Sequence, residues 1–208
     1  MIKIYEDFLP QELAEELHDE IYKTPDNWWT YAYKYFDKKP VYMQHTLTGL
    51  NAKRKLDEAV ERSFQEGNFS YKFKRSMKHV DTCKCYECKF NNYLNNEFVE
   101  WLKNNTFLEN PYKYESFVSI YDRGDFLSSH TDEQRGIAFI FNLTKNWKPE
   151  YGGMLHISRD EGIEVVYPKF NSLVIMELGD GGLSHYVSEV SQYATHQRIA
   201  ISGWFNES

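Results

Sequence analysis

The sequence predicts an α+β fold that is mainly β, with helices in its N-terminal half and short strands in its C-terminal half. After Pro111 the chain consists of short apolar or alternating runs with no helical periodicity between them. Turn signals separate these runs, including Tyr151-Gly152-Gly153 and Asp180-Gly181-Gly182. Short strands at this spacing are typical of a β-sandwich or barrel. The expected strands cover 115–121, 136–143, 153–158, 162–167, 172–178, 185–190 and 197–205.

The N-terminal half shows helical periodicity in three segments and strand alternation in one. Leu13, Leu17 and Ile21 recur every four residues, and Pro10 suits the first turn of a helix. Asn51 is a suitable cap for the second helix. The expected helices cover 10–23, 51–66 and 92–103, and an alternation of aromatic and polar residues predicts a half-buried strand over 68–75.

Composition favours one domain over residues 1–208, with 1–110 as a helical support region and 111–208 as the β core. Aromatic residues make up 17% of the chain, so rings should dominate its interior. The net charge of −7 lacks the basic patch that nucleic-acid binding usually needs. The chain has no apolar run long enough for a membrane span and no apolar signal-peptide segment after Met1. A cytoplasmic protein is therefore expected, with no nucleic-acid or membrane partner.

His130, Asp132 and His185 form the most informative pattern of the chain. Two imidazoles and one carboxylate are the protein ligands of a non-haem Fe(II) centre that keeps open coordination positions. If 129–133 is a strand, His130 and Asp132 project from the same face, because the strand period is two. A lone strand histidine is more often a surface or core residue, so the spacing alone leaves a structural role open.

Arg198 adds a second observation to this pattern, because it opens an apolar strand in which a charge is costly unless it is paired. A 2-oxoglutarate cosubstrate would chelate iron through its keto-acid end and leave its far carboxylate in need of a cation. A guanidinium fork suits a carboxylate better than a lysine ammonium does. Strand parity places Arg198, Ala200, Ser202 and Trp204 on one face and Ile199, Ile201 and Phe205 on the other. A structural salt bridge is the alternative role for Arg198.

Five blocks of the C-terminal half resemble the prolyl 4-hydroxylase-like 2-oxoglutarate oxygenases. They occur in that family's order and spacing and include the iron-site entry, the turn at Trp147 and the closing strand. The blocks are Glu115 to Asp132, Phe141 to Leu155 with its Gly152-Gly153 pair, Tyr167 to Met176, His185-Tyr186-Val187 to Val190, and Arg198 to Phe205.

This resemblance implies a double-stranded β-helix (jelly-roll) core with the N-terminal helices packed outside it. It implies a 2-oxoglutarate-dependent dioxygenase that uses Fe(II), 2-oxoglutarate and O2, with ascorbate as a candidate reductant. The catalytic set would be His130, Asp132, His185 and Arg198. Tyr121 stands where the family often has a tyrosine that touches 2-oxoglutarate, and Asn142 replaces a second tyrosine with a shorter hydrogen-bond donor.

Prolyl 4-hydroxylase-type activity on a peptide or protein is the activity that the resemblance favours. Hydroxylation of a free amino acid or another small molecule is the alternative within the same chemistry. A non-catalytic jelly-roll binding module is the alternative from a different class of protein. Retention of Arg198 argues against that module, because a binding protein without turnover has no need for a cosubstrate anchor.

The three cysteines of the chain, Cys83, Cys85 and Cys88, lie close together and follow His79. These four soft ligands suit tetrahedral zinc, although the Cys-x-Cys spacing is tighter than in common zinc knuckles. Three reduced thiols in a surface loop are the alternative, and the sequence alone favours that alternative. An odd number of cysteines argues against a disulfide framework.

Overall fold

The structure is a computed structural model that describes residues 1–44, 50–77, 83, 85–132, 136–179 and 182–208, without the side chain of Leu50. The helices are α1 (Gln11–Lys23), α2 (Leu50–Gln65), α3 (Tyr86–Asn95) and α4 (Glu97–Asn105). The strands are β1 (Ile2–Tyr5), β2 (Thr30–Lys34), β3 (Val41–Gln44), β4 (Tyr71–Arg75), β5 (Pro111–Tyr121), β6 (Phe126–His130), β7 (Gly136–Asn142), β8 (Leu155–Arg159), β9 (Gly162–Val166), β10 (Ser172–Glu177), β11 (His185–Val187) and β12 (Arg198–Glu207).

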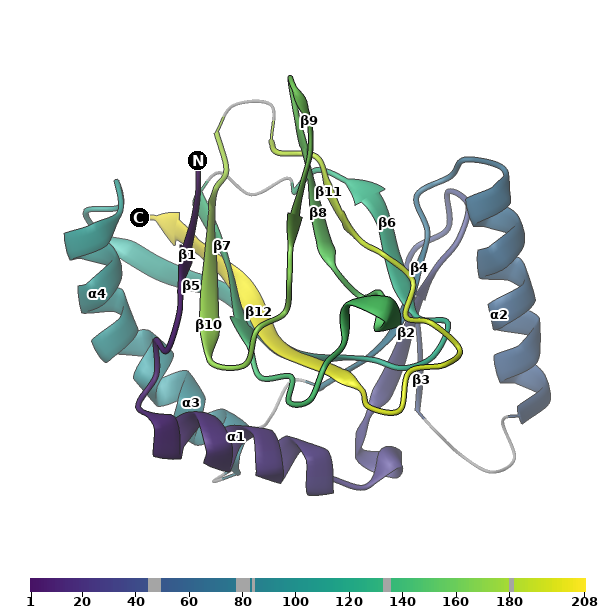
Figure 1. Cartoon of the computed structure of the whole chain (residues 1–208), viewed down its shortest axis with the longest axis horizontal. Coiled ribbons are helices and arrows are strands. Elements are labelled where there is room, and N and C mark those ends of the chain that lie inside the picture. The colour runs from purple at the N-terminus through teal and green to yellow at the C-terminus, as the bar shows by residue number, and fades with distance from the viewer. Residues whose placement is uncertain (45–49, 78–82, 84, 133–135, 180–181) are drawn as a thin grey trace.

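Strands β5 to β12 form the double-stranded β-helix that the resemblance implied. One sheet has the strand order β10-β7-β12-β5 and the other the order β6-β11-β8-β9. Successive strands alternate between the two sheets, except for the antiparallel hairpin of β8 and β9. Strand β4 pairs with both β5 and β6 and thus joins the two sheets along one edge, so that the sheet curls around its interior (Figure 1). The predicted jelly-roll core is confirmed.

The long strand β12 separates two hydrophobic clusters, because alternate side chains leave opposite faces of a sheet. Ile199, Ile201 and Phe205 belong to the cluster on the helix side. Ala200 belongs to the cluster inside the β-helix, and partly buried Trp204 packs against it. The parity predicted for this strand is therefore confirmed, and it directs Arg198 towards the interior.

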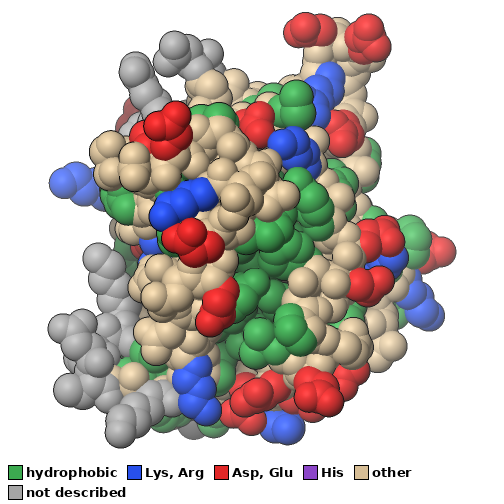
Figure 2. Space-filling view, turned by 90° about the vertical axis from the view of Figure 1, so that its left-hand side faces the viewer, with side chains coloured by type: hydrophobic (Ala, Val, Ile, Leu, Met, Phe, Trp, Pro, Cys, Tyr) green, Lys and Arg blue, Asp and Glu red, His purple; other side chains and the backbone are tan. Residues whose placement is uncertain are grey.

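Aromatic rings fill the space between the sheet and the helices. Helices α1, α3 and α4 lie along the outer face of the first sheet, whereas α2 lies on the other side of the molecule (Figure 1). Phe98 of α4 is fully buried and packs against the rings of Phe139, Phe141 and Phe205. On the face at the left of Figure 1, a strip of hydrophobic side chains runs down the middle between charged groups (Figure 2).

Three details of the N-terminal half differ from the sequence-based expectation. The helix expected over 92–103 is two helices, because the backbone of Asn96 leaves the helical region and its side chain donates to the carbonyl of Asn92. The second helix begins at Leu50, so Asn51 lies within it. Residues 1–110 are not a purely helical support, since they supply four strands to the sheet. The alternation over 68–75 predicted β4, whereas β1, β2 and β3 were not predicted and are defined by their pairing with neighbouring strands. The expectation of one domain stays a prediction.

No helix of the described residues combines the length and the apolar character needed to cross a membrane.

The turn between β5 and β6 contains a buried carboxyl group, and this predicts a pH-dependent stability. Burial raises the pKa of Asp125 to about 7, although its Oδ2 accepts the N–H of Asp122 at 2.8 Å. The folded state therefore holds a proton more tightly than the unfolded state between about pH 4 and pH 7. We expect the free energy of unfolding to fall by a few kcal/mol, at about 1.4 kcal/mol per pKa unit, as the pH rises through this window.

Asp125→Asn provides the check, because asparagine keeps an oxygen acceptor for the Asp122 N–H but does not ionise. In urea unfolding the variant should gain stability relative to the parent chain between pH 5 and pH 8. An identical pH dependence in both chains would show that Asp125 titrates normally.

Candidate metal and cosubstrate site

Neighbouring strands bring the three predicted metal ligands together. His130 ends β6 and His185 begins β11, and these two histidines are register partners in the β6–β11 ladder. Asp132 follows two residues after β6, with Oδ1 at 3.6 Å from Nε2 of His130 and Oδ2 at 3.8 Å from Nε2 of His185. One ligand atom from each residue lies within 4.8 Å of the others. The two-histidine, one-carboxylate arrangement therefore forms in the folded chain.

The strand that carries His130 ends earlier in the chain than the sequence suggested. Strand β6 ends at His130, so Asp132 is not a strand residue, and 133–135 lie outside the described residues. The chain leaves the sheet after His130, and Asp132 still reaches the same point in space. The predicted convergence was correct, but simple strand alternation does not produce it.

Backbone carbonyls orient both imidazoles towards this point. Nδ1 of His130 lies 3.1 Å from the carbonyl oxygen of Ser128, and Nδ1 of His185 lies 2.7 Å from that of Leu183. An Nδ1–H that donates to a carbonyl leaves the Nε2 lone pair free for a metal. The tautomer of each ring is thus assigned from its hydrogen bond.

The carboxylate of Asp132 is kept ionised although it is largely buried. Burial acts to raise its pKa, but the hydrogen bond from the Trp204 indole and the nearby imidazoles of His130 and His185 lower that pKa below the usual range. Burial and the neighbouring His130 lower the pKa of His185. An ionised carboxylate beside neutral imidazoles is the protonation state that a divalent metal requires.

Trp204 positions Asp132, and this contact gives a graded prediction. Its indole Nε1 donates to Oδ2 of Asp132 at 2.9 Å. Loss of such an outer contact typically weakens metal binding by about tenfold to a hundredfold. We expect Trp204→Phe to lower the Fe(II) affinity by about tenfold, because phenylalanine keeps a ring but has no donor.

An anaerobic titration against a fluorescent chelator measures this effect. Trp28→Phe, at a tryptophan that is 67% exposed, is the matched control and should bind iron like the parent chain. Equal iron affinity in both variants would mean that the Trp204–Asp132 hydrogen bond does not support the metal site.

Arg198 is buried inside the β-helix without a carboxylate partner. Only 3% of the residue is exposed, its Nε has no hydrogen-bond partner, and no ion pair joins it to a carboxylate of the described residues. Burial lowers its pKa, and the guanidinium lies 5.0 Å from the centre of the Tyr121 ring. Leaving a buried cation unpaired is costly, which indicates that a ligand supplies the missing anion.

The glycine pair before β8 makes room for this arginine. Gly152 and Gly153 have φ values of 67° and 63°, in the left-handed region that favours glycine. A Cβ on Gly153 would lie 3.2 Å from Cδ of Arg198. The glycines therefore permit the close turn that the sequence predicted, and this turn packs directly on the arginine stem.

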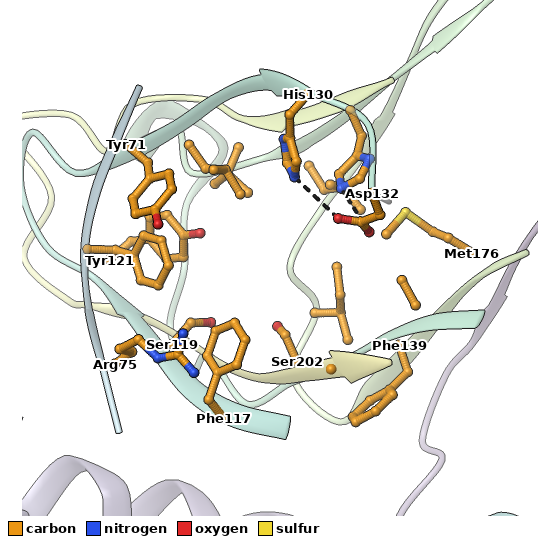
Figure 3. A pocket seen from close by; sticks show the side chains of 18 of the residues that line it. Tyr71, Arg75, Phe117, Ser119, Tyr121, His130, Asp132, Phe139, Met176 and Ser202 are labelled. Atoms are coloured by element: carbon orange, nitrogen blue, oxygen red, sulfur yellow. Dashed lines mark ion pairs between the residues drawn. The ribbon is translucent and has the colours of Figure 1, made fainter. Parts of the chain in front are cut away.

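A cavity of about 240 Å³ connects the candidate metal ligands with Arg198, since all four residues line it. Tyr121 lies across this cavity from His130 and Asp132 (Figure 3). Because the Arg198 guanidinium lies over the Tyr121 ring, the cation and the metal ligands occupy different sides of the same space. A second arginine of the cavity, Arg75, is already paired with Glu115 at 2.8 Å. Arg198 is thus the lining arginine that is available to a carboxylate.

Aromatic residues before and within β4 complete the cavity, and no sequence motif predicted them to be part of the site. Phe69, Tyr71 and Phe73 line the cavity, and the Phe69 ring stacks on His130 with centroids 5.1 Å apart. The alternation over 68–75 was the available signal, because it placed these three rings on one face. Trp204, which parity placed on the cavity side, also lines the cavity.

Asn142 does not line this cavity in the described structure. It lies opposite Ala200 in the β7–β12 ladder, and its Nδ2 donates to Oγ of Ser172 at 3.0 Å. Its Oδ1 is buried without a partner. The expected contact of Asn142 with 2-oxoglutarate stays a prediction.

A double-stranded β-helix with two histidines, one carboxylate and an unpaired interior arginine defines the class of non-haem iron oxygenases that use 2-oxoglutarate. Residues 116–206 match the sequence profile of the 2OG-Fe(II) oxygenase superfamily. This segment of the chain belongs to that superfamily, and the resemblance to its prolyl 4-hydroxylase-like members is confirmed.

Two curated relatives are similar to a larger part of the chain. Prolyl 3-hydroxylase OGFOD1 of Xenopus laevis is 30% identical over 160 residues, and that of Mus musculus is 29% identical over 147 residues. These alignments cover 72% and 66% of this chain but only 31% and 27% of the relatives. The chain therefore spans about a third of the length of the curated relatives it matches.

Solved structures confirm the fold. A Pseudomonas putida prolyl-4-hydroxylase aligns with a TM-score of 0.61 and 17% identity over 99% of this chain and 92% of that chain. A Trichoplax adhaerens prolyl hydroxylase, in complex with a peptide fragment of a hypoxia-inducible factor, aligns with a TM-score of 0.64 and 15% identity. That alignment covers 99% of this chain and 83% of the other.

Proposed function

We propose that this chain is an Fe(II)- and 2-oxoglutarate-dependent dioxygenase that hydroxylates a prolyl residue of a peptide or protein. One observation carries the proposal: a single cavity contains a convergent set of two histidines and an aspartate, together with a buried arginine that forms no ion pair with a carboxylate of the described residues. The first feature suits Fe(II), and the second suits the far carboxylate of 2-oxoglutarate.

His130, Asp132 and His185 would hold the iron, and Arg198 would pair with the cosubstrate carboxylate. When bound, iron with 2-oxoglutarate and O2 supplies the oxidising power for inserting oxygen into a C–H bond. The protein contributes position and exclusion of water. The Nδ1 atoms of His130 and His185 are hydrogen-bonded to backbone carbonyls, which leaves both Nε2 atoms free for the metal. The indole of Trp204 holds the Asp132 carboxylate in position. The rings of Phe73, Phe117 and Tyr121 give the cavity apolar walls.

Several features favour a prolyl substrate. The two curated relatives are named prolyl 3-hydroxylases, and the two similar solved structures are named prolyl hydroxylases. Apolar and aromatic walls suit a pyrrolidine ring, and partly exposed Phe69 beside His130 offers a surface on which such a ring could stack. The curated relatives are named for hydroxylation at C3 of the proline ring and the Pseudomonas putida enzyme for hydroxylation at C4. We therefore propose hydroxylation at either of these two carbons.

A free amino acid or another small molecule is the alternative substrate within this chemistry. The non-catalytic binding module is disfavoured by Arg198, because a buried unpaired cation stabilises nothing unless an anion binds. We place the protein in a reducing, cytoplasmic setting, and three cysteines that form no disulfide in the described structure support this.

Turnover with and without substrate tests this function. Purified protein with Fe(II), ascorbate and 2-oxoglutarate should release succinate, and a library of proline-containing peptides should reveal sequences that gain one oxygen atom. Amino-acid analysis of the product then distinguishes 3-hydroxyproline from 4-hydroxyproline. Oxygen gain on free amino acids alone would overturn the peptide assignment, and an absence of succinate with iron bound would support the binding module.

A further inference from the structure

We propose that Cys83, Cys85 and Cys88 form a structural zinc site, separate from the iron site, that ties the chain segment after β4 to the start of α3. The three Sγ atoms lie within 4.8 Å of one another, and all three residues are partly exposed. The sequence alone could not show this convergence, because Cys83 stands outside any regular element.

The start of α3 explains why two of the thiols meet. Cys85 is the N-cap of α3 and Cys88 lies in its first turn. Side chains at the N-cap and three residues later face each other, as they do in a capping box. Burial raises the pKa of both thiols, that of Cys88 to about 12, so a metal that binds here has to displace the thiol protons.

The distances between the sulfur atoms fit zinc after a small adjustment. Zinc–sulfur bonds of about 2.3 Å in a tetrahedron place the sulfur atoms about 3.8 Å apart. Thiolates select zinc over the harder metals that oxygen and imidazole ligands prefer, so the two sites of this chain would take different ions. Binding exchanges thiol protons for the metal, with no change in oxidation state. His79, the fourth ligand that spacing predicts, lies outside the described residues, and the proposal therefore rests on the three thiols.

The surroundings of the cluster give the metal an entry route and a structural task. Cys83 and Cys85 line an open cavity beside Trp28 and Trp29, so an ion can reach them. The carboxylate of neighbouring Glu87 is not a ligand, since it is buried and accepts the hydroxyl of Ser76 at 2.6 Å. Beyond the cluster, α3 contributes Phe90 and Leu94 to the main hydrophobic core. Zinc would thus join Cys83 to a helix that is already packed on the core.

Metal analysis of four proteins separates this site from the iron site. The parent chain is prepared with added zinc and without chelator and is then passed through a mild chelator. His130→Ala/His185→Ala should retain about one equivalent of zinc, because it lacks the other candidate site. Cys85→Ser and Cys88→Ser should lose that equivalent and still bind Fe(II). Cobalt substitution should produce a sulfur-to-cobalt charge-transfer band in the histidine variant and none in the cysteine variants.

A measurement on the parent chain keeps the test decisive if the cysteine variants do not fold. A mercurial reagent should release zinc to a chromogenic indicator in step with modification of the three thiols. A folded cysteine variant should show a melting temperature lower by several degrees and faster proteolysis after β4. Three freely reactive thiols without zinc, a disulfide between two of them, or zinc that leaves only with the histidine ligands would each overturn the proposal. None of these outcomes would affect the oxygenase assignment.

Discussion

Replacing His185 by alanine is expected to abolish Fe(II) binding and 2-oxoglutarate turnover. His185 contributes one of three ligands, and its ring centroid lies 4.3 Å from that of His130. Two remaining ligands would hold a labile divalent ion poorly. Because changes outside the ligand set typically cost about tenfold to a hundredfold in affinity, loss of a ligand should exceed a hundredfold. His130→Ala should behave in the same way, and Asp132→Ala should also lose turnover.

Anaerobic Fe(II) titration and succinate release measure these two effects separately. His156→Ala is the matched control, because His156 lies on β8 directly opposite Tyr186 of the neighbouring strand and does not line the cavity. The control should bind iron and turn over 2-oxoglutarate like the parent chain. If both His130→Ala and His185→Ala retained full turnover, the assignment of the metal site would be wrong.

Arg198→Lys is expected to raise the KM for 2-oxoglutarate by more than tenfold with little change in Fe(II) affinity. Lysine retains a positive charge but loses the planar fork that binds a carboxylate with two parallel hydrogen bonds. A tenfold change corresponds to about 1.4 kcal/mol. Arg198 is a register partner of Tyr121 on β5, so this cation is held in one place by the sheet. A flexible lysine chain loses that alignment.

Binding of 2-oxoglutarate to the iron-loaded protein, measured by calorimetry, accompanies the kinetic test. Arg159→Lys is the matched control, because Arg159 forms an exposed ion pair with Glu164 at 2.6 Å in the β8–β9 hairpin. A thermal melt shows whether the variant is folded. If Arg198→Lys unfolded the protein while the folded fraction kept its affinity for 2-oxoglutarate, Arg198 would be a structural residue and the cosubstrate anchor would lie elsewhere.

Much of the fold class and of the metal site could be predicted from local pattern. Alternation within β12 assigned Arg198 and Trp204 to the inner face and Ile201 to the outer face, because side-chain direction in a strand depends only on parity. The candidate metal ligands could be proposed from the sequence because few residue types bind Fe(II), and the blocks around them limit where such residues stand. For the faces of β12 and for the candidate metal ligands alike, a few residues that are adjacent in the sequence are enough to make the prediction.

Only the tertiary structure decided which distant segments meet. The pairing of His130 with His185, the place of β4 between the two sheets and the hydrogen bond from Trp204 to Asp132 all join residues far apart in sequence. Strand partners are chosen by backbone hydrogen bonds that every residue offers alike, so periodicity cannot name the partner. The sequence by itself therefore determined the chemistry of the side chains and the faces they occupy. Sheet register and packing determined the cavity that they share.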